Sequence, residues 1–220
     1  IAFAILSPVF LVLCVVAIRS EEIQPWMRYQ SEFRELFVER ATVKLKAAQA
    51  QQDAKEIAHW QRVVDEASSA APEVAQVYLE DIKVADRCVT CHRGIDNPLF
   101  ADAPQPFRTH SGEILKHHPA ATFGCTLCHG GQGWAIDTAA AHGEVAHWEE
   151  PLLSRSLGES YTLAGNKNAL MQMNCNVCHR YDRETKGADF INHAKQLVQD
   201  KGCRACHVIN GRGGTIGPDL

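Results

Sequence analysis

The chain has 220 residues, a formal net charge of −4 at pH 7 and 45% apolar residues. Such a chain lacks the positive field of a nucleic-acid-binding protein, so nucleic acid is not an expected partner. Aromatic residues make up only 7% of the chain. The second half has few long apolar runs and is rich in Gly, His and Cys, so we expect a thin protein core there that needs additional apolar material.

Residues 1–18 are almost wholly apolar (IAFAILSPVFLVLCVVAI). Their number is at the lower limit for a membrane-spanning helix, and we predict a transmembrane anchor over residues 1–20. A cleaved signal peptide and a buried helix packed against other subunits are the alternatives. Since neither Met nor a basic residue precedes Ile1, we expect the natural chain to begin earlier, with Lys or Arg on the cytoplasmic side.

Residues 21–85 contain helix-forming sequence and are predicted to be a helical linker or docking region. Apolar residues recur at helical spacing after Pro25, which suits a first helical turn, and a stretch of strong helix formers follows. A break at residues 68–72 precedes a second predicted helix that begins at Glu73. The apolar stripe indicates packing against another helix, either in another subunit or in a self-contained helical hairpin. The stripe consists of Trp26, Tyr29, Phe33, Leu36 and Phe37.

Four times in the rest of the chain, Cys-x-x-Cys is followed at once by His. We call these segments the first to fourth motifs. This pattern is the attachment motif for c-type haem (heme c). Residues three and four apart share one face of a helical turn, so two thiols can meet the two vinyl groups at one porphyrin edge while the His lies beneath the iron as proximal ligand. The motifs are Cys88-Cys91-His92, Cys125-Cys128-His129, Cys175-Cys178-His179 and Cys203-Cys206-His207.

Zinc is the main alternative, because two Cys-x-x-Cys pairs can form one Cys₄ site. The spacings from Cys91 to Cys125 and from Cys178 to Cys203 allow such sites. Neither zinc nor a disulfide explains the His after every second Cys, however. We therefore expect four haem c groups, whose propionates would add roughly −8 to the net charge. Residues 86–165 would form a dihaem module, and residues 166–220 would hold the third and fourth haems.

The sixth iron ligands are expected from the seven remaining histidines. His110 and His118 lie between the first two motifs, and His142 follows the second, so we predict these three as distal ligands. Their neighbours His117 and His147 are alternatives for this role. A histidine that contacts a propionate or the solvent is the simpler interpretation for any one of them, and His59 is expected on a helix surface.

The chain around the fourth motif resembles a class I cytochrome c. An amphipathic helix, the motif and a Gly-rich loop ending in Gly-Pro-Asp-Leu follow one another over residues 188–220. The resemblance implies that Pro218 packs near His207. It also implies a distal Met well downstream, so either this domain is truncated at Leu220 or the fourth haem takes another ligand. Met171 and Met173 are expected to be packing residues rather than ligands.

Over residues 25–220 the chain is similar to membrane-anchored multihaem cytochromes that accompany bacterial quinol-oxidising cytochrome b complexes or related respiratory modules. The motif surroundings VADRCVTCHRGIDNPLF, HHPAATFGCTLCHGGQG and AAAHG carry this resemblance. It implies a non-catalytic electron-transfer subunit at the bacterial cytoplasmic membrane, with its haem domain in the periplasm.

The same resemblance implies three kinds of partner: the membrane, other subunits of the complex, and a soluble or membrane-bound redox protein. A multihaem redox enzyme acting on a small nitrogen or sulfur compound and a polymerising cytochrome wire are the alternatives. The expected fold is mainly α, with a transmembrane helix, a long amphipathic helical region and a loop-rich multihaem domain with little or no β-sheet.

Overall fold

A computed structural model of the chain describes residues 2–22, 24–80, 83–146, 148, 152–153 and 169–220. The chain divides into two compact units. Unit 1 comprises residues 1–124 and 134–138, and unit 2 comprises residues 125–133 and 139–220. Helices dominate the described part of both units, and the sheets are short and two-stranded. The predicted mainly α fold with little or no sheet is confirmed, and the dihaem module expected at residues 86–165 stays a prediction.

Helix α1 (Ala2–Glu22) covers the predicted anchor segment and contains Pro8. No helix in the part of the chain that the structure describes is long and apolar enough to cross a membrane. The predicted transmembrane helix over residues 1–20 is therefore wrong, and with it the placement of the chain as a single-pass protein of the cytoplasmic membrane with a periplasmic domain.

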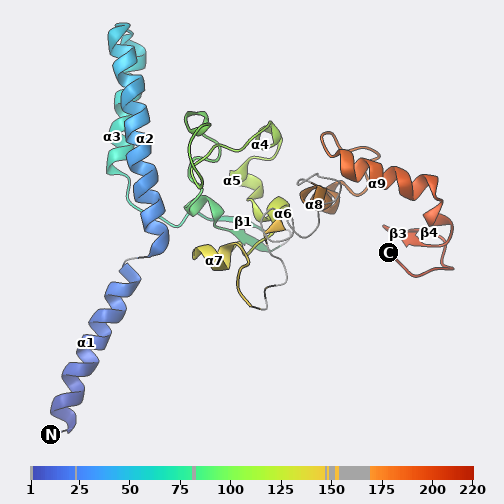
Figure 1. Ribbon diagram of the computed structural model, residues 1–220, viewed down its shortest axis with the longest axis horizontal. Coiled ribbons are helices and arrows are strands. Elements are labelled where there is room, and N and C mark those ends of the chain that lie inside the picture. Colours follow the sequence, from blue (N-terminus) through green and yellow to red (C-terminus); the bar gives the residue numbers. More distant parts are fainter. Residues whose placement is uncertain (1, 23, 81–82, 147, 149–151, 154–168) are drawn as a thin grey trace. The chain divides into compact units, whose positions relative to one another are not determined.

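Helices α2 (Pro25–Ala50) and α3 (Ala54–Ser69) form a hairpin and lie side by side (Figure 1). Pro25 occupies the first turn of α2, where its fixed φ suits the helix and its missing N–H costs nothing. The turn contains Gln52, with a left-handed φ of 55°. Asp53 then caps α3, because its carboxylate accepts hydrogen bonds from the backbone N–H groups of Lys55 and Glu56 at 3.0 and 3.1 Å.

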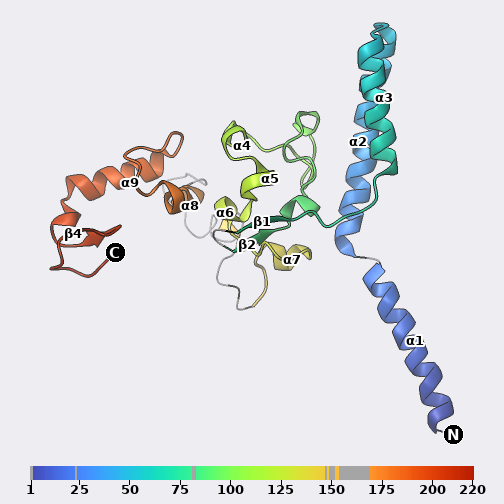
Figure 2. The ribbon, with the colours of Figure 1, turned by 180° about the vertical axis from the view of Figure 1, so that it is seen from behind.

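The helix predicted to begin at Glu73 is wrong. Strands β1 (Val77–Leu79) and β2 (Val84–Asp86) form an antiparallel hairpin instead, in which Val77 pairs with Asp86 and Leu79 with Val84 (Figure 2). The β-branched Val77 and Val84 and the aromatic Tyr78 favour a pleated surface over a helix. The hairpin leads directly into the first motif, so it replaces the helix that we expected to position it.

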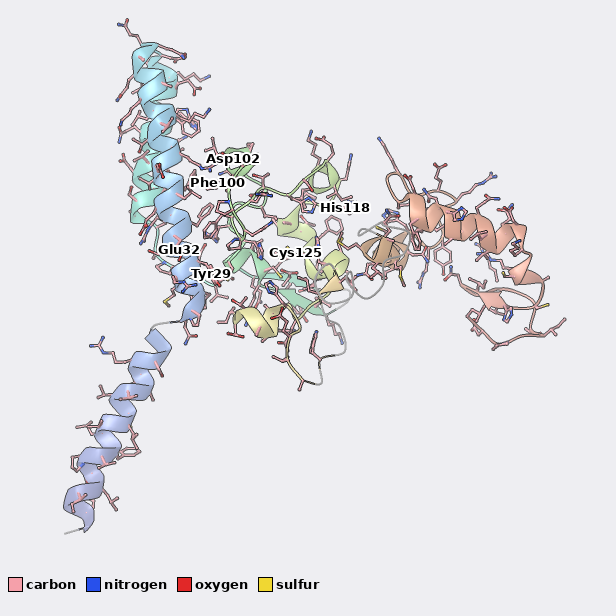
Figure 3. The ribbon with its side chains drawn as sticks, viewed as in Figure 1. Tyr29, Glu32, Phe100, Asp102, His118 and Cys125 are labelled. Atoms are coloured by element: carbon pink, nitrogen blue, oxygen red, sulfur yellow. The ribbon has the colours of Figure 1, made fainter. Side chains whose placement is uncertain are left out.

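The core of unit 1 lies between α2 and the loop that follows the first motif. Phe100, at the end of the 3₁₀ helix η2 (Pro98–Phe100), is fully buried, and its ring stacks on Phe33 of α2 with a centroid distance of 4.7 Å (Figure 3). Arg40 of α2 donates hydrogen bonds to the Leu99 carbonyl and the Asp102 carboxylate. The apolar stripe of α2 therefore packs against residues of the same chain. Two short helices, α4 (Ile114–His117) and α5 (Ala120–Phe123), complete the unit.

Unit 2 is built from short elements around the remaining motifs. Helix α8 (Ala169–His179) packs against α6 (Thr126–His129) and α9 (Asp189–Asp200). The buried apolar side chains among its described residues are Ala169, Ala188 and Ile191, so the expected thin core is confirmed. The other elements are α7 (Thr138–Ala141), η4 (Cys203–Ala205) and the antiparallel strands β3 (Val208–Ile209) and β4 (Arg212–Gly213).

Candidate functional site

Each of the four motifs contains a turn of helix. In the first, second and fourth motifs, the backbone N–H of the His donates to the carbonyl of the first Cys at 2.9–3.0 Å. The third motif forms the last turn of α8. In this geometry the two Cys and the His of each motif share one helical face, as haem attachment requires. All eight motif cysteines are free thiols, so the chemistry and the local geometry of the four motifs fit covalently attached haem.

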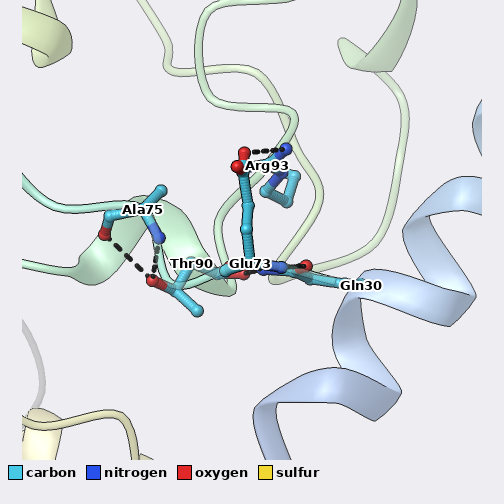
Figure 4. A network of polar contacts seen from close by, with 5 residues as sticks. All are labelled: Gln30, Glu73, Ala75, Thr90 and Arg93. Carbon is cyan, nitrogen blue, oxygen red and sulfur yellow. Dashed lines mark hydrogen bonds and ion pairs between the residues drawn. The ribbon is translucent and has the colours of Figure 1, made fainter. Parts of the chain in front are cut away.

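The first motif is held by a buried polar network that reaches it from α2 (Figure 4). The Gln30 amide is 8% exposed. Its Nε2 donates to the carbonyls of Glu73 and Thr90 at 2.7 and 2.8 Å, and its Oε1 accepts from the Glu73 N–H at 3.0 Å. Thr90 lies between Cys88 and Cys91, and its buried hydroxyl exchanges hydrogen bonds with the backbone of Ala75 at 3.0 and 3.1 Å. Satisfied networks of this kind fix a local geometry strongly.

The start of the first motif is fixed by Asp86. This fully buried carboxylate accepts a hydrogen bond from the Cys88 N–H at 3.0 Å. The backbone of Gly124 lies so close that a Cβ there would be 2.8 Å from the Asp86 Cβ, and its φ of +63° also favours glycine. Burial raises the pKa of the neighbouring Cys91 thiol. The first motif is thus enclosed by protein on several sides.

The second and third motifs touch each other. Asn174, the residue before Cys175, donates from Nδ2 to the Cys128 carbonyl at 3.1 Å. The pKa of the Cys128 thiol is raised chiefly by burial and further by the Cys175, Cys125 and Cys178 thiols. Groups attached at these two motifs would therefore be close neighbours.

The histidine of the third motif faces a carboxylate. His179 Nδ1 lies 2.6 Å from Asp182 Oδ2, and a neutral imidazole donates its N–H there. Lys195 of α9 holds this turn, because its ammonium donates to the carbonyls of His179 and Asp182 at 2.7 and 3.0 Å. Donation by Nδ1 leaves the lone pair of the ring on Nε2, the nitrogen that would face iron.

The histidine of the fourth motif faces a backbone carbonyl. His207 Nδ1 donates to the Pro218 carbonyl at 2.8 Å, the contact that the class I resemblance implies. The Gly217 N–H donates to the Cys206 carbonyl at 2.7 Å. A Cβ on Gly217 would be only 2.6 Å from Cε1 of the His207 ring, so glycine is needed for the backbone to lie against the imidazole.

The predicted distal ligands lie near motifs, and their ligand role stays a prediction. The His110 N–H donates to the Ile95 carbonyl at 2.8 Å, three residues after the first motif. The His118 ring packs edge-on against Phe123 in unit 1. His142 directly follows Ala141, whose carbonyl accepts from Gln132 at 2.9 Å beyond the second motif.

The other candidates take varied positions. His117 and His59 are exposed on α4 and α3, and His147 lies outside the described residues. Met173 is about half exposed on α8 and Met171 is partly buried.

Zinc bound by the third and fourth motifs together finds no support in the positions of their thiols. Among the described residues of unit 2, no four cysteines place their sulfur atoms within reach of one ion. A structural zinc site needs four such ligands at about 2.3 Å from the metal.

Sequence reasoning missed several residues that position the motifs, among them Gln30, Asp86, Thr90, Asp182 and Lys195. The sequence could have predicted the contact of Asp182 with His179, because the two residues have the i+3 spacing at which side chains meet on a helical turn. Gln30 had none, since its partner Thr90 is 60 residues away in the sequence.

Comparison with known proteins finds no matching family model, no matching curated protein and no matching solved structure. A functional assignment therefore depends on the residues and the geometry of this chain.

Proposed function

We propose that this chain is a tetrahaem c-type cytochrome that transfers electrons. One observation carries the proposal: four Cys-x-x-Cys-His motifs, each with two free thiols and a histidine on one helical turn. When bound, each haem iron would carry one electron by cycling between its ferric and ferrous states.

The residues around the motifs have the tasks that this function requires. Gln30, Thr90 and Asp86 hold the first attachment turn in a fixed geometry. The contact between Asn174 and Cys128 keeps the second and third attachment turns adjacent, which supports electron transfer between neighbouring centres. The Nδ1 hydrogen bonds of His179 and His207 orient their rings and select the tautomer that presents Nε2 to a metal.

Electron relay explains the histidine content better than a redox enzyme does. An enzyme needs an iron with an open coordination position, whereas a relay needs closed ones. Eleven histidines minus the four proximal ones leave seven, more than the four sixth ligands that closed irons require. By its resemblance to multihaem cytochromes, the chain would relay electrons between a quinol-oxidising cytochrome complex and a further redox protein.

The experiment is an anaerobic reductive titration of the full chain, expressed in a bacterium that ligates c-type haem. We expect uptake of four electrons per chain, followed by rapid reoxidation when a ferric soluble cytochrome c is added. The control variant, Cys203→Ser with Cys206→Ser, should take up three. Uptake that does not follow the number of intact motifs, or a reduced protein that fails to pass electrons to the added cytochrome, would overturn the proposal.

A further inference from the structure

The third and fourth proximal histidines differ in the charge of the group that accepts their Nδ1 hydrogen bond. His179 donates to the Asp182 carboxylate at 2.6 Å, whereas His207 donates to the neutral Pro218 carbonyl at 2.8 Å. A hydrogen bond to an ionised acceptor is roughly twice as strong as one to a neutral acceptor. It also increases the basicity of the ring, and so the electron density that Nε2 offers to a metal.

Hydrogen bonds within unit 2 fix the position of Asp182. Its N–H donates to the His179 carbonyl at 3.1 Å, and the Lys195 ammonium bonds both carbonyls of this turn. The same loop is fixed further along by a reciprocal pair, in which the Asn192 amide and the Thr185 backbone exchange two hydrogen bonds of 2.8 Å. Two residues of α9 thus hold the segment that presents Asp182 to His179.

We propose that Asp182 is a positioning residue that lowers the reduction potential of the third haem below that of the fourth. The inference rests on the proposed attachment of haem at both motifs. Greater donation from His179 stabilises the more positive ferric iron relative to ferrous iron, so the third iron accepts its electron less readily. Electrons would therefore pass downhill from the third haem to the fourth.

The size of the effect follows from the exposure of the pair. The His179 and Asp182 side chains are 36% and 51% exposed, so solvent screens part of the interaction. We expect a shift of at most about tenfold in the ferric-to-ferrous ratio at a given potential, which corresponds to about 59 mV for one electron.

The test is a mediated spectroelectrochemical titration of the four-haem chain and its Asp182→Asn variant. Asn keeps a neutral oxygen acceptor at nearly the same size, so the third potential should rise while the other three stay unchanged. Asp182→Ala, which removes the acceptor altogether, should raise it further. A companion variant, Cys175→Ser with Cys178→Ser, identifies the third component as the one that disappears.

The matched control is Glu184→Gln, which removes an equal charge from an exposed residue two positions away. We expect the control to leave the third potential within the error of the titration. An equal shift in both variants would show a general charge effect and overturn the inference, as would no shift in Asp182→Asn. Haem content, measured first by pyridine haemochrome, separates the outcomes: a chain without haem at the third motif defeats the proposed function, and a loaded chain without a shift defeats only the role of Asp182.

Discussion

The first and fourth motifs reach the same turn geometry by different means. The first depends on a buried amide from a helix 60 residues earlier in the chain, and its surroundings include a packed aromatic core. The fourth is shaped by the residues that follow it, through contacts of His207 and Cys206 with Gly217 and Pro218. A short local segment suffices to orient a proximal histidine, whereas the enclosure of a motif requires distant parts of the sequence.

Removing the contact that Gln30 makes with the first motif should have the largest effect on stability. Gln30→Ala leaves the buried Thr90 carbonyl and the partly buried Glu73 carbonyl without their amide donor, which should destabilise unit 1 by about 2–4 kcal/mol. Hydrogen exchange resolved by mass spectrometry should show faster exchange in unit 1 and no change in unit 2. Gln61→Ala, which removes an exposed amide on α3, is the control and should stay within about 0.5 kcal/mol. Equally faster hydrogen exchange in both units would contradict the difference between the first and fourth motifs.

Disturbing the contact between Gly217 and His207 at the fourth motif should have a smaller effect on stability, confined to that motif. In Gly217→Ala, the new Cβ would overlap the His207 ring, and relief of this overlap should cost about 1–3 kcal/mol. In the haem-loaded chain, only one of the four electron paramagnetic resonance components should change. Gly211→Ala adds the strain of a left-handed φ of +71° but meets no neighbouring atom within 4 Å. If both variants changed that component equally, a general disturbance of the loop rather than the contact with His207 would be responsible.

The enclosure of the first motif should also be visible in thiol chemistry. Burial raises the pKa of Cys91, so in the folded, haem-free chain its alkylation by iodoacetamide should require a higher pH than in the urea-unfolded chain. Because the folded pKa is the higher one, the stability from the protonated thiol is present below the unfolded pKa and is lost as the pH rises through the folded pKa. Identical pH profiles in the two states would show that the thiol is open to solvent.

Removing the ion pair between Arg40 and Asp102 should have the smallest effect on stability. The hydrogen bond from Arg40 lowers the pKa of the fully exposed Asp102 carboxyl, and exposed pairs contribute little. The contribution of the ion pair to stability should be present above the ordinary pKa of an Asp carboxyl. It should vanish as the pH falls through the lowered pKa of Asp102. Thermal midpoints of the wild type and Asp102→Asn should therefore differ slightly at pH 7 and converge in strong acid. A gap that persists in acid would point to a contact other than the ion pair, and Asp96→Asn controls for the lost charge.

The sequence predicted what depends on short-range pattern. The i, i+3, i+4 spacing of each motif predicted a helical turn, and the apolar stripe of α2 predicted a packed helix. The low apolar content of the second half predicted the thin core of unit 2. The contact between Pro218 and His207 followed from the resemblance to class I cytochrome c.

What the sequence did not reveal depends on tertiary contact or on competing local preferences. Residues 73–87 hold both helix formers and β-branched residues, and the strand preference of Val77 and Val84 prevailed. The packing of Phe100 on Phe33 and the bond from Gln30 to Thr90 join segments about 60 residues apart, and no periodicity encodes such pairs. The apolar run at the start of the chain was predicted as a membrane span, but no helix among the described residues is long and apolar enough for one.

The most direct test of the central claim is the intact mass of the full chain after expression with haem-ligation enzymes. We predict the polypeptide mass plus four haems, with each Cys-to-Ser pair in one motif removing one haem. A chain that carries fewer than four haems, with the thiols of the unloaded motifs still reactive toward iodoacetamide, would contradict the account.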